Sequence, residues 1–274
     1  MGAAMAGRLS GLGHEMMVWN RTADKARALG FKVADSPQAL AEGCETVISM
    51  LTDAAAVEAV YEGLLSASVE GKLFIEMSTV RPDSSKRIDA RVRAKHAAFV
   101  ECPVGGSVGP AKEGKLFGFA GGDDAAVARA RPILDQLCRR LEHVGPAGAG
   151  ASMKLAINLP LLVYWQALAE ALSLCKPLGL DPARLMDIFS DTSGAPMMLK
   201  NRAGAIAAAL AGKDTAVSVN VDTMRKDLRE MVAEGRALGG RMPLTEQALA
   251  CFDEASRDGL GAKDCTRLPA RWVS

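Results

Sequence analysis

The sequence is poor in the residues that many binding sites need. Aromatic residues make up 4% of its 274 residues, and its three histidines, His14, His96 and His143, lie far apart in the chain. Its six cysteines form no C-x-x-C pair. This spacing argues against a zinc site or a disulfide framework and is typical of a protein of the reducing cytoplasm. We therefore expect a cytoplasmic protein without a bound metal.

Neither sign of charge is in excess, and long apolar runs are missing. Lys plus Arg number 33 and Asp plus Glu number 32, which gives a net charge of +1. That balance excludes the basic surface of a nucleic-acid-binding protein and a polybasic membrane anchor. Asn158 and Pro160 interrupt the most apolar stretch, residues 155–163, which is shorter than the roughly 18 apolar residues of a membrane span. We expect neither nucleic acid nor a membrane as a partner.

What the first half of the chain does contain is an alternation of short apolar runs and amphipathic stretches. The expected strands are 16–19, 47–51, 73–77, 98–104, 116–120 and 141–144, and the expected helices are 23–29, 54–65, 83–96 and 125–137. Strands that alternate with helices of this length predict βαβ units, with a parallel sheet covered by helices on both faces. The fold class expected here is therefore α/β, a doubly wound, Rossmann-like sheet.

The alternation stops at a Gly- and Pro-rich segment, residues 145–150. Beyond it the expected elements are all helices, at 154–175, 182–189, 199–210, 221–238 and 244–258. Such a segment is typical of a domain boundary. We expect an α/β domain over residues 1–146 and an all-helical domain over residues 147–274.

The opening of the chain departs from this fold. A doubly wound domain normally begins with an apolar strand and a glycine-rich turn that leads into its first helix. Here residues 1–9 already have the pattern of a helix. A missing central strand removes about 1.5–3 kcal/mol for each large buried side chain, a loss comparable with a domain's stability of roughly 5–15 kcal/mol. We expect a sheet without its first strand, in a chain shortened at its N-terminus and with an incomplete dinucleotide-binding domain.

Asn20, Arg21 and Thr22 directly follow an expected strand. In a dinucleotide-binding sheet the end of the second strand meets the adenosine ribose, where an Arg accommodates a 2′-phosphate. The alternative is that Asn20 or Thr22 caps the next helix and that Arg21 is a solvated surface charge.

A glycine-rich loop follows the strand expected at 98–104. Gly105, Gly106, Gly109 and Gly114 could let backbone N–H groups converge on an anion such as a carboxylate or sulfonate. A loop tip that binds nothing is the alternative interpretation.

Lys154 and Asn158 are four residues apart at the start of the long helix, so they lie on one face of it, and that face continues to Trp165. A lysine is unfavourable near the positive end of a helix, which indicates a functional role, although an exposed surface lysine is the alternative. The pair Lys226 and Asp227 lies in a later expected helix, where such a pair usually belongs to a solvated face.

Together these segments resemble the β-hydroxyacid dehydrogenase family over essentially the whole chain. Met1-Gly2 matches the last two positions of the family's opening G-x-G-x-M-G. Further matches are Asn20-Arg21-Thr22, Met50-Leu51-Thr52, Met77-Ser78-Thr79, and residues 101–107 against D-A-P-V-S-G-G. The most specific are Gly148, Gly150, Lys154 and Asn158 against G-x-G-x-x-x-K-x-x-x-N, and Lys226-Asp227-Leu228 against K-D-L.

The resemblance implies an NAD(P)-dependent oxidoreductase that transfers a hydride between nicotinamide and a small β-hydroxyacid or its semialdehyde. Lys154 would be the catalytic acid–base residue. The substrate would be held by Gly105, Gly106, Ser107, Asn158 and Trp165. The cofactor would be held by Gly2, Asn20, Arg21, Thr22, Met50, Leu51, Thr79, Lys226 and Asp227. The Asn-Arg-Thr form is associated with NADP, so NADP is the expected cofactor, with NAD possible.

Two further expectations accompany the resemblance. A small anionic hydroxyacid or aldehyde is expected as the substrate, and a homodimer or homotetramer as the assembly. Gly105 stands where most members have a loop serine, and Ser107 could replace that hydroxyl, so the resemblance leaves the individual substrate open. Because the phosphate-binding turn is also missing, the alternative is a dimeric relative that is non-catalytic or has lost cofactor binding.

Overall fold

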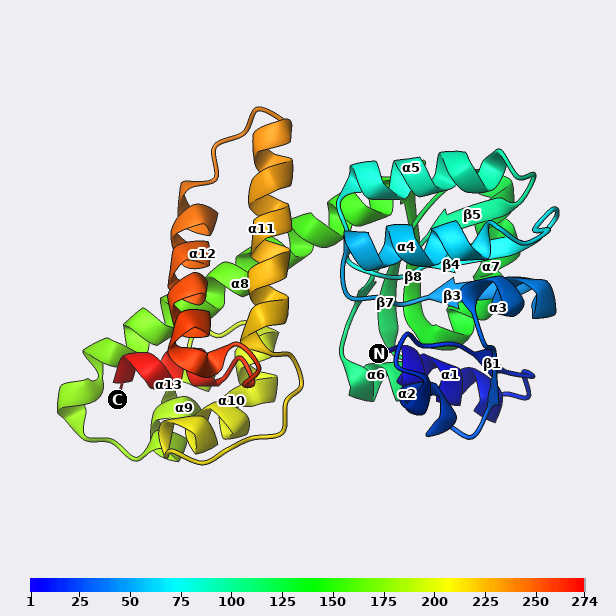
Figure 1. Cartoon of the computed structure of the whole chain (residues 1–274). Coiled ribbons are helices and arrows are strands. Elements are labelled where there is room, and N and C mark those ends of the chain that lie inside the picture. Colours follow the sequence, from blue (N-terminus) through cyan, green and yellow to red (C-terminus); the bar gives the residue numbers. More distant parts are fainter. Residues whose placement is uncertain (274) are drawn as a thin grey trace. The chain divides into compact units, whose positions relative to one another are not determined.

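The computed structural model describes residues 1–273, which form two compact units, Met1–Leu155 and the chain from Ala156 onward. Figure 1 shows both units, and each is described here by itself. Helix α8 (Ala149–Leu174) contains the residue at which one unit gives way to the other. The domain boundary expected at residue 146 stays a prediction.

The first unit contains a mixed sheet. Strands β3 (Thr46–Ser49), β4 (Leu73–Glu76) and β5 (Ala98–Glu101) pair in parallel. Strand β7 (Leu116–Gly121) runs antiparallel to β5 and to β6 (Val104–Gly105), and parallel to β8 (Cys138–Gly145). The doubly wound fold followed by helices is confirmed, but the expectation of a wholly parallel sheet is wrong at β6 and β7. The expected strand 98–104 is divided there because Pro103 has no N–H to donate to a ladder.

A second, smaller sheet is formed by the parallel strands β1 (Met17–Val18) and β2 (Lys32–Val33). Among the described residues β1 pairs only with β2, and β3 pairs only with β4. In a doubly wound fold the first strand lies between the strands that correspond to β1 and β3. The sheet is therefore divided at the position of that strand. This division agrees with the expectation of a sheet without that strand.

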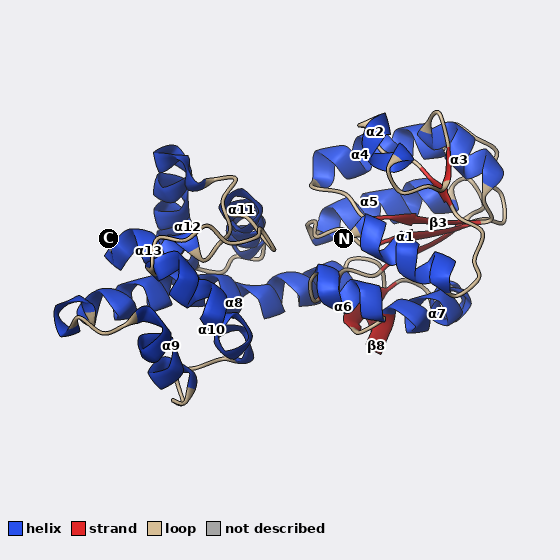
Figure 2. Ribbon diagram, turned by 90° about the horizontal axis from the view of Figure 1, so that it is seen from below, coloured by secondary structure: helices blue, strands red, loops and turns tan. Residues whose placement is uncertain are grey.

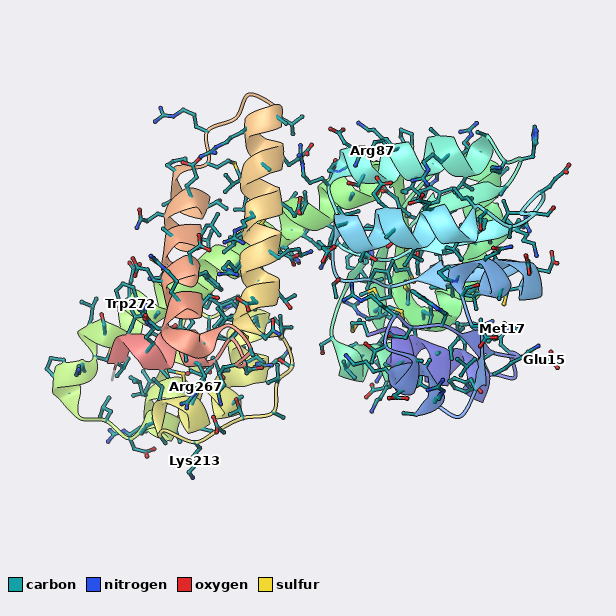
Figure 3. All side chains as sticks on the ribbon, viewed as in Figure 1. Glu15, Met17, Arg87, Lys213, Arg267 and Trp272 are labelled. Atoms are coloured by element: carbon teal, nitrogen blue, oxygen red, sulfur yellow. The ribbon has the colours of Figure 1, made fainter. Side chains whose placement is uncertain are left out.

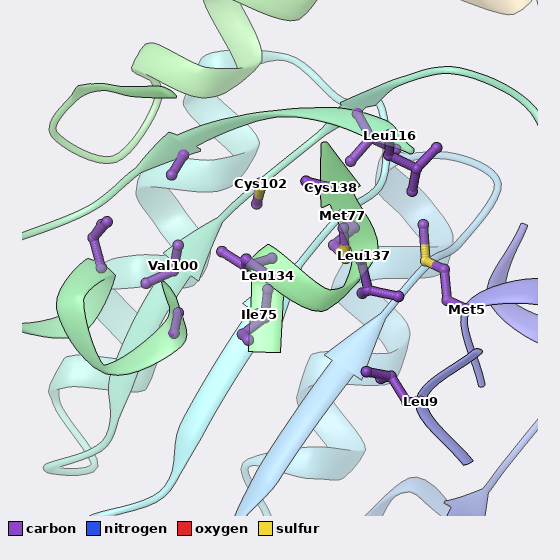
Figure 4. Close-up of a cluster of buried hydrophobic side chains, with 14 of the residues drawn as sticks. Met5, Leu9, Ile75, Met77, Val100, Cys102, Leu116, Leu134, Leu137 and Cys138 are labelled. Carbon is purple, nitrogen blue, oxygen red and sulfur yellow. The ribbon is translucent and has the colours of Figure 1, made fainter. Parts of the chain in front are cut away.

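Helices cover both faces of the larger sheet because successive strand residues point to opposite sides. Leu73, Ile75 and Val100 pack with residues of α1, α6 and α7, as the close-up in Figure 4 shows for Ile75 and Val100. Phe74 and Phe99 pack on the other side with residues of α3, α4 and α5. Figure 2 shows the strands between these two groups of helices. The helices of this unit are α1 (Gly2–Gly11), α2 (Ala23–Arg27), α3 (Pro37–Gly43), α4 (Ala54–Leu64), α5 (Pro82–Arg93), α6 (Val108–Glu113) and α7 (Asp124–Leu137).

Surface ion pairs join neighbouring helices. Arg87 and Arg91 of α5 both donate to the Glu58 carboxylate of α4, at 3.2 and 2.7 Å; Figure 3 labels Arg87. Five elements were not expected from the sequence: β2, α3, α6 and, in the second unit, η1 (Lys176–Leu178) and α13. Helix α6 lies within the segment expected as a loop, so the glycine-rich stretch is shorter than predicted.

The second unit is built from helices. They are the later part of α8, the short turns η1 (Lys176–Leu178) and η2 (Ser256–Leu260), and the helices α9 (Pro182–Ser190), α10 (Met197–Leu210), α11 (Val221–Ala237), α12 (Pro243–Ala255) and α13 (Arg267–Val273). Asp264 ties the end of the chain to the loop before α11. Its carboxylate accepts from the Ser218 and Thr266 amides at 2.8 and 3.0 Å and pairs with Arg202.

Helix α8 is 26 residues long and, by length and apolar composition alone, could span a membrane. From the sequence we expected no apolar run near the roughly 18 residues of a membrane span. That expectation is wrong for α8, because a span tolerates the isolated polar residues that interrupt its apolar run. A core helix of a globular unit satisfies the same criterion. The expected absence of a membrane partner stays a prediction.

Gly118 of β7 is packed so closely that adding one methyl group there should lower the stability of the protein. A Cβ there would lie 2.8 Å from Cys102 Sγ and 2.9 Å from Leu141 Cδ1, so Gly118→Ala should lower the free energy of unfolding by about 1–3 kcal/mol through overpacking. Denaturant unfolding measures this loss.

Gly204 of α10 is the matched control, since a Cβ there meets nothing within 4 Å. Gly204→Ala should raise the unfolding free energy by about 0.4–1 kcal/mol. Equal effects of the two substitutions would contradict this account of the packing.

Candidate active site at the carboxyl edge of the sheet

The last residues of three parallel strands lie in one row. Ser49 pairs in register with Glu76, and Glu76 with Glu101. The segments that follow these strands therefore meet at the same edge, where open α/β sheets bind their ligands. They include Met50 and Leu51 after β3, Thr79 shortly after β4, and the segment 102–107 after β5.

Hydrogen bonds from side chains fix two of these segments to each other. The Leu51 N–H donates to Ser78 Oγ at 2.7 Å, and the Ser78 N–H donates to Glu76 Oε1 at 2.7 Å. Ser49 donates to the other oxygen of Glu76 and lies 3.1 Å from the Tyr61 hydroxyl. Leu51 and the residue before Thr79, both in segments expected to bind a cofactor, are thus held in one network.

The start of α1 lies at the same edge. A Cβ on Gly2 would lie 3.6 Å from Met50 Cβ, so two of the expected cofactor residues are neighbours. Helix α1 has no side-chain cap and no acidic residue in its first turn, whereas Ser36, Asp53 and Asp123 cap α3, α4 and α7. The positive end of α1 is thus not neutralised by a carboxylate, which suits the phosphates of a dinucleotide.

Asn20, Arg21 and Thr22 form an exposed turn between β1 and α2. The Thr22 N–H donates to Asn20 Oδ1 at 2.9 Å. Thr22 occupies the N-cap position of α2, but its side chain makes no capping hydrogen bond. The Thr22 hydroxyl does not cap α2, but Asn20 accepts from the amide at the start of that helix and Arg21 is exposed, so the cofactor role of this turn and its alternative both stay predictions.

The loop expected to hold the substrate's anionic group is short and shaped by one glycine. Gly105 ends β6, and Gly106 follows with φ = +127°. A Cβ on Gly106 would lie 2.8 Å from Leu116 Cδ2, so both its backbone angle and its surroundings require glycine. Ser107 precedes α6 and is half-buried, and its side chain does not cap that helix.

Lys154 lies in the first unit, near the start of α8, and its side chain is buried at 7% exposure. The helix start is bonded to the sheet edge, because Glu101 Oε1 accepts from the Gly148 and Gly150 amides at 2.7 and 2.8 Å. Asn158 is half-buried and follows Lys154 by four residues in the same helix, so helical periodicity gives the two a common face. The structure therefore excludes the alternative of an exposed surface lysine.

The remaining expected site residues belong to the second unit. Trp165 is 1% exposed, and among the described residues its Nε1 has no hydrogen-bond partner. Lys226 Nζ lies 2.6 Å from Asp227 Oδ1 on α11, so these side chains form an ion pair rather than a purely solvated face. The roles of Trp165, Lys226 and Asp227 stay predictions.

Two buried carboxylates, Glu76 and Glu101, were given no role by the sequence analysis. Each is 1% exposed at the end of an apolar strand. An acidic residue that ends a buried strand must find hydrogen-bond donors, and that rule could have singled out both. No group of three or more His, Cys, Asp or Glu residues that could hold a metal occurs among the described residues.

Comparison with known proteins decides the family. Residues 1–145 match the model of the NAD binding domain of 6-phosphogluconate dehydrogenase. Residues 148–271 match the model described as NAD-binding of NADP-dependent 3-hydroxyisobutyrate dehydrogenase. The chain belongs to the β-hydroxyacid dehydrogenase family. The resemblance inferred from the sequence motifs is confirmed.

Individual relatives of this β-hydroxyacid dehydrogenase chain agree over nearly its whole length. It is 34% identical to 3-hydroxyisobutyrate dehydrogenase of Pseudomonas aeruginosa, covering 98% of this chain and 95% of the relative. It is 33% identical to glyoxylate/succinic semialdehyde reductase 1 of Arabidopsis thaliana, covering 96% and 92%. The solved structure of 3-hydroxyisobutyrate dehydrogenase from Salmonella typhimurium superposes with a TM-score of 0.87 at 26% identity, covering 98% and 95%.

These matches give the class of reaction. The chain is an NAD(P)-dependent oxidoreductase whose family transfers hydride between nicotinamide and small hydroxyacids. The function expected from the sequence is confirmed at this level. The alternative, a relative that is non-catalytic or deficient in cofactor binding, is not favoured.

The buried acid Glu76 gives the edge a pH-dependent stability. Burial raises the pKa of Glu76 from 4.5 to about 7, against the hydrogen bonds from Ser49 and Ser78. Between pH 4.5 and 7 the unfolded chain loses this proton more readily than the folded one. Stability should therefore fall by about 3 kcal/mol as the pH rises through that window, and stay at the lower value above it.

Glu76→Gln should remove this fall, because the amide keeps the shape of the acid and does not ionise. Denaturant unfolding of both proteins from pH 4 to pH 8.5 measures the difference. Parallel stability curves would show that Glu76 does not titrate in this window.

Proposed function

We propose that this chain is an NADPH-preferring reductase of small anionic aldehydes, and a dehydrogenase of the corresponding β-hydroxyacids, with Lys154 as its acid–base residue. The observation that carries the proposal is the place of Lys154. It is buried in the first turns of α8, in the same unit as the cofactor edge. Three residues before it, the Ala151 N–H donates to Glu101 at 3.2 Å, at the end of β5. Three residues rise about 4.5 Å along a helix, so Lys154 lies about that far along the axis from Ala151.

The residues of the edge suit a phosphorylated dinucleotide. The uncapped start of α1 at Gly2 would hold the pyrophosphate, Met50, Leu51 and Thr79 would line the path of the cofactor, and Arg21 with Thr22 would bind the 2′-phosphate. The nicotinamide supplies the hydride for reduction or accepts it in oxidation. The family model that matches the second half of the chain is itself described as NADP-dependent, which supports the preference.

Lys154 would donate a proton to the carbonyl oxygen of the aldehyde as negative charge develops there. In the direction of oxidation the neutral amine would accept the proton of the hydroxyl group. Its burial limits exchange of this proton with water, and Asn158, one helical turn on, would donate a hydrogen bond to the substrate. A general acid of this kind typically contributes about 10²–10⁴-fold to the rate.

The substrate's carboxylate would lie against the loop of Gly105, Gly106 and Ser107. The positive φ of Gly106 turns the backbone there, so neighbouring N–H groups can face an anion. Ser107 brings a hydroxyl that does not cap α6. The relatives are named for glyoxylate, succinic semialdehyde and 3-hydroxyisobutyrate, which are small carboxylates, and this supports an anionic substrate.

The proposal also includes a homodimer or homotetramer in a reducing, cytoplasmic compartment. All six cysteines are free thiols in the structure, which is compatible with such a compartment.

Removing the amine of Lys154 tests the acid–base role. Lys154→Ala should lower kcat about 10²–10⁴-fold with a small aldehyde acid and leave NADPH binding within a few-fold, because the general acid is lost but the cofactor residues remain. Steady-state kinetics and NADPH fluorescence titration measure the two effects.

Lys95→Ala is the control for this substitution, because Lys95 is an exposed lysine after α5. It should leave both parameters unchanged. Near-wild-type turnover of Lys154→Ala would contradict the proposed role.

Removing the guanidinium of Arg21 tests the cofactor preference. Arg21→Ala should raise the KM for NADPH about tenfold or more, through loss of a charge-assisted contact worth about 1.5–3 kcal/mol, and leave the KM for NADH nearly unchanged.

Arg27→Ala serves as the comparison, because Arg27 is an exposed arginine of α2 that already pairs with Asp24 at 2.8 Å. It should change neither KM. A wild-type preference for NADH, or equal effects of Arg21→Ala on both cofactors, would sink the assignment of Arg21 to the 2′-phosphate.

A further inference from the structure

Glu101 makes an unusual set of hydrogen bonds for a residue that ends a strand. Its Oε1 alone accepts three backbone N–H groups, from Gly148 at 2.7 Å, Gly150 at 2.8 Å and Ala151 at 3.2 Å. These amides belong to the start of α8 and to the residue just before it. The first amides of a helix have no partner within it, and a carboxylate is the acceptor that the positive end of a helix favours.

The close approach of the carboxylate depends on residues without a side chain. A Cβ on Gly121 of β7 would lie 2.5 Å from Glu101 Oε1. A Cβ on Gly150 would lie 2.3 Å from the Phe119 carbonyl oxygen and 3.2 Å from Glu101 Oε1. Gly148 has φ = +97°, which a residue with a side chain rarely adopts. The glycines around the helix start thus make room for this one acceptor.

Other hydrogen bonds also hold this glycine-rich segment, among them Ala149 N–H to the Pro146 carbonyl and Gly122 N–H to the Gly145 carbonyl, both at 3.0 Å. Gly145, Gly148 and Gly150 fall within six residues, and glycine restricts the backbone least. Helices α4, α7 and α9 are capped by an aspartate of their own chain segment, whereas the cap of α8 comes from β5, 47 to 50 residues earlier. Glu101 therefore connects the first turns of α8, which belong to the first unit, to the sheet edge.

The reach of Glu101 can be tested separately from its charge. Burial raises the pKa of Glu101, and the Ser85 side chain and the three amides oppose that rise. A glutamine has the same length and offers one carbonyl oxygen, which can accept the same N–H groups without a buried charge. Alanine removes the acceptor, and its loss leaves buried amides without a partner.

We infer that Glu101 is a positioning residue for Lys154, which fixes the first turns of α8 against the end of β5 so that the lysine amine meets the substrate. This inference rests on the proposed function, in which Lys154 carries the proton. Gly150 and Ala151 precede Lys154 by four and three residues. Residues at these spacings are neighbours on one side of a helix, so the bonded amides lie one turn before the lysine. A misplacement of about 1 Å at a reacting group can lower a rate about 10²-fold.

The experiment compares Glu101→Ala and Glu101→Gln in the whole protein. Glu101→Ala should lower kcat about 10²-fold and leave the KM for NADPH within about threefold, while Glu101→Gln should keep most of kcat. Hydrogen–deuterium exchange followed by mass spectrometry gives a readout without substrate or cofactor. Amides of residues 148–155 should exchange faster in Glu101→Ala and nearly as in the wild type in Glu101→Gln.

Asp123→Ala is the matched control. Asp123 caps α7 by accepting from the Ala126 N–H at 2.9 Å, and it is not one of the residues proposed to bind cofactor or substrate. This variant should lose a comparable amount of thermal stability, raise exchange at the start of α7 and keep the wild-type kcat. If Glu101→Ala and Asp123→Ala reduce kcat equally, or if exchange over residues 148–155 does not change, the inference is overturned.

The design separates failure of this inference from failure of the proposed function. An active wild type with an inactive Lys154→Ala, together with a fully active Glu101→Ala, rejects the positioning role alone. A wild type that turns over no small aldehyde acid rejects the proposed function. In that case the exchange of residues 148–155 still decides whether Glu101 fixes the helix turn that carries Lys154.

Discussion

The bond between one carboxylate and the start of one helix is the constraint on which the proposed site depends. Glu101 ends the strand β5 of the sheet, and α8 carries Lys154. Without an acceptor at that point, three buried amides would lack partners. With it, the lysine has a defined place relative to the edge where the strands end.

The row formed by Ser49, Glu76 and Glu101 gives this edge its character. Each residue ends its strand in register with the next. The Ser49 side chain donates to Glu76, and the two carboxylates accept from segments that follow the strands. Ser49 and Glu76 organise the turns of Leu51 and Ser78, and Glu101 organises α8. A buried polar row of this kind must satisfy its own hydrogen bonds, and in doing so it fixes the backbone that a dinucleotide would contact.

Much of the fold could be predicted from the sequence, because apolar runs and amphipathic stretches alternate clearly up to residue 145. The short elements could not. Strand β2 has two residues and α6 has six, with Gly109 and Pro110 inside it, so neither carries a periodic signal. The antiparallel course of β7 was missed because pattern indicates strands but not their direction.

The candidate site was predicted unevenly. Spacing placed Lys154 and Asn158 on one helix face, and the family resemblance gave them roles. Glu76 and Glu101 each end an apolar strand, and the need of a buried acid for hydrogen-bond donors is the signal that could have found them. Their partners come from the structure, in which both are 1% exposed and Gly121 and Gly150 pack against the Glu101 carboxylate.

The central claim is that Lys154 moves the proton while nicotinamide moves the hydride. Its most direct test is the pH dependence of a single turnover, followed as NADPH oxidation by a small aldehyde acid in a stopped-flow instrument. The account predicts that the wild-type rate falls at high pH as the lysine loses its proton, and that Lys154→Met shows a slow rate without this fall. The same pH profile in both proteins would contradict it.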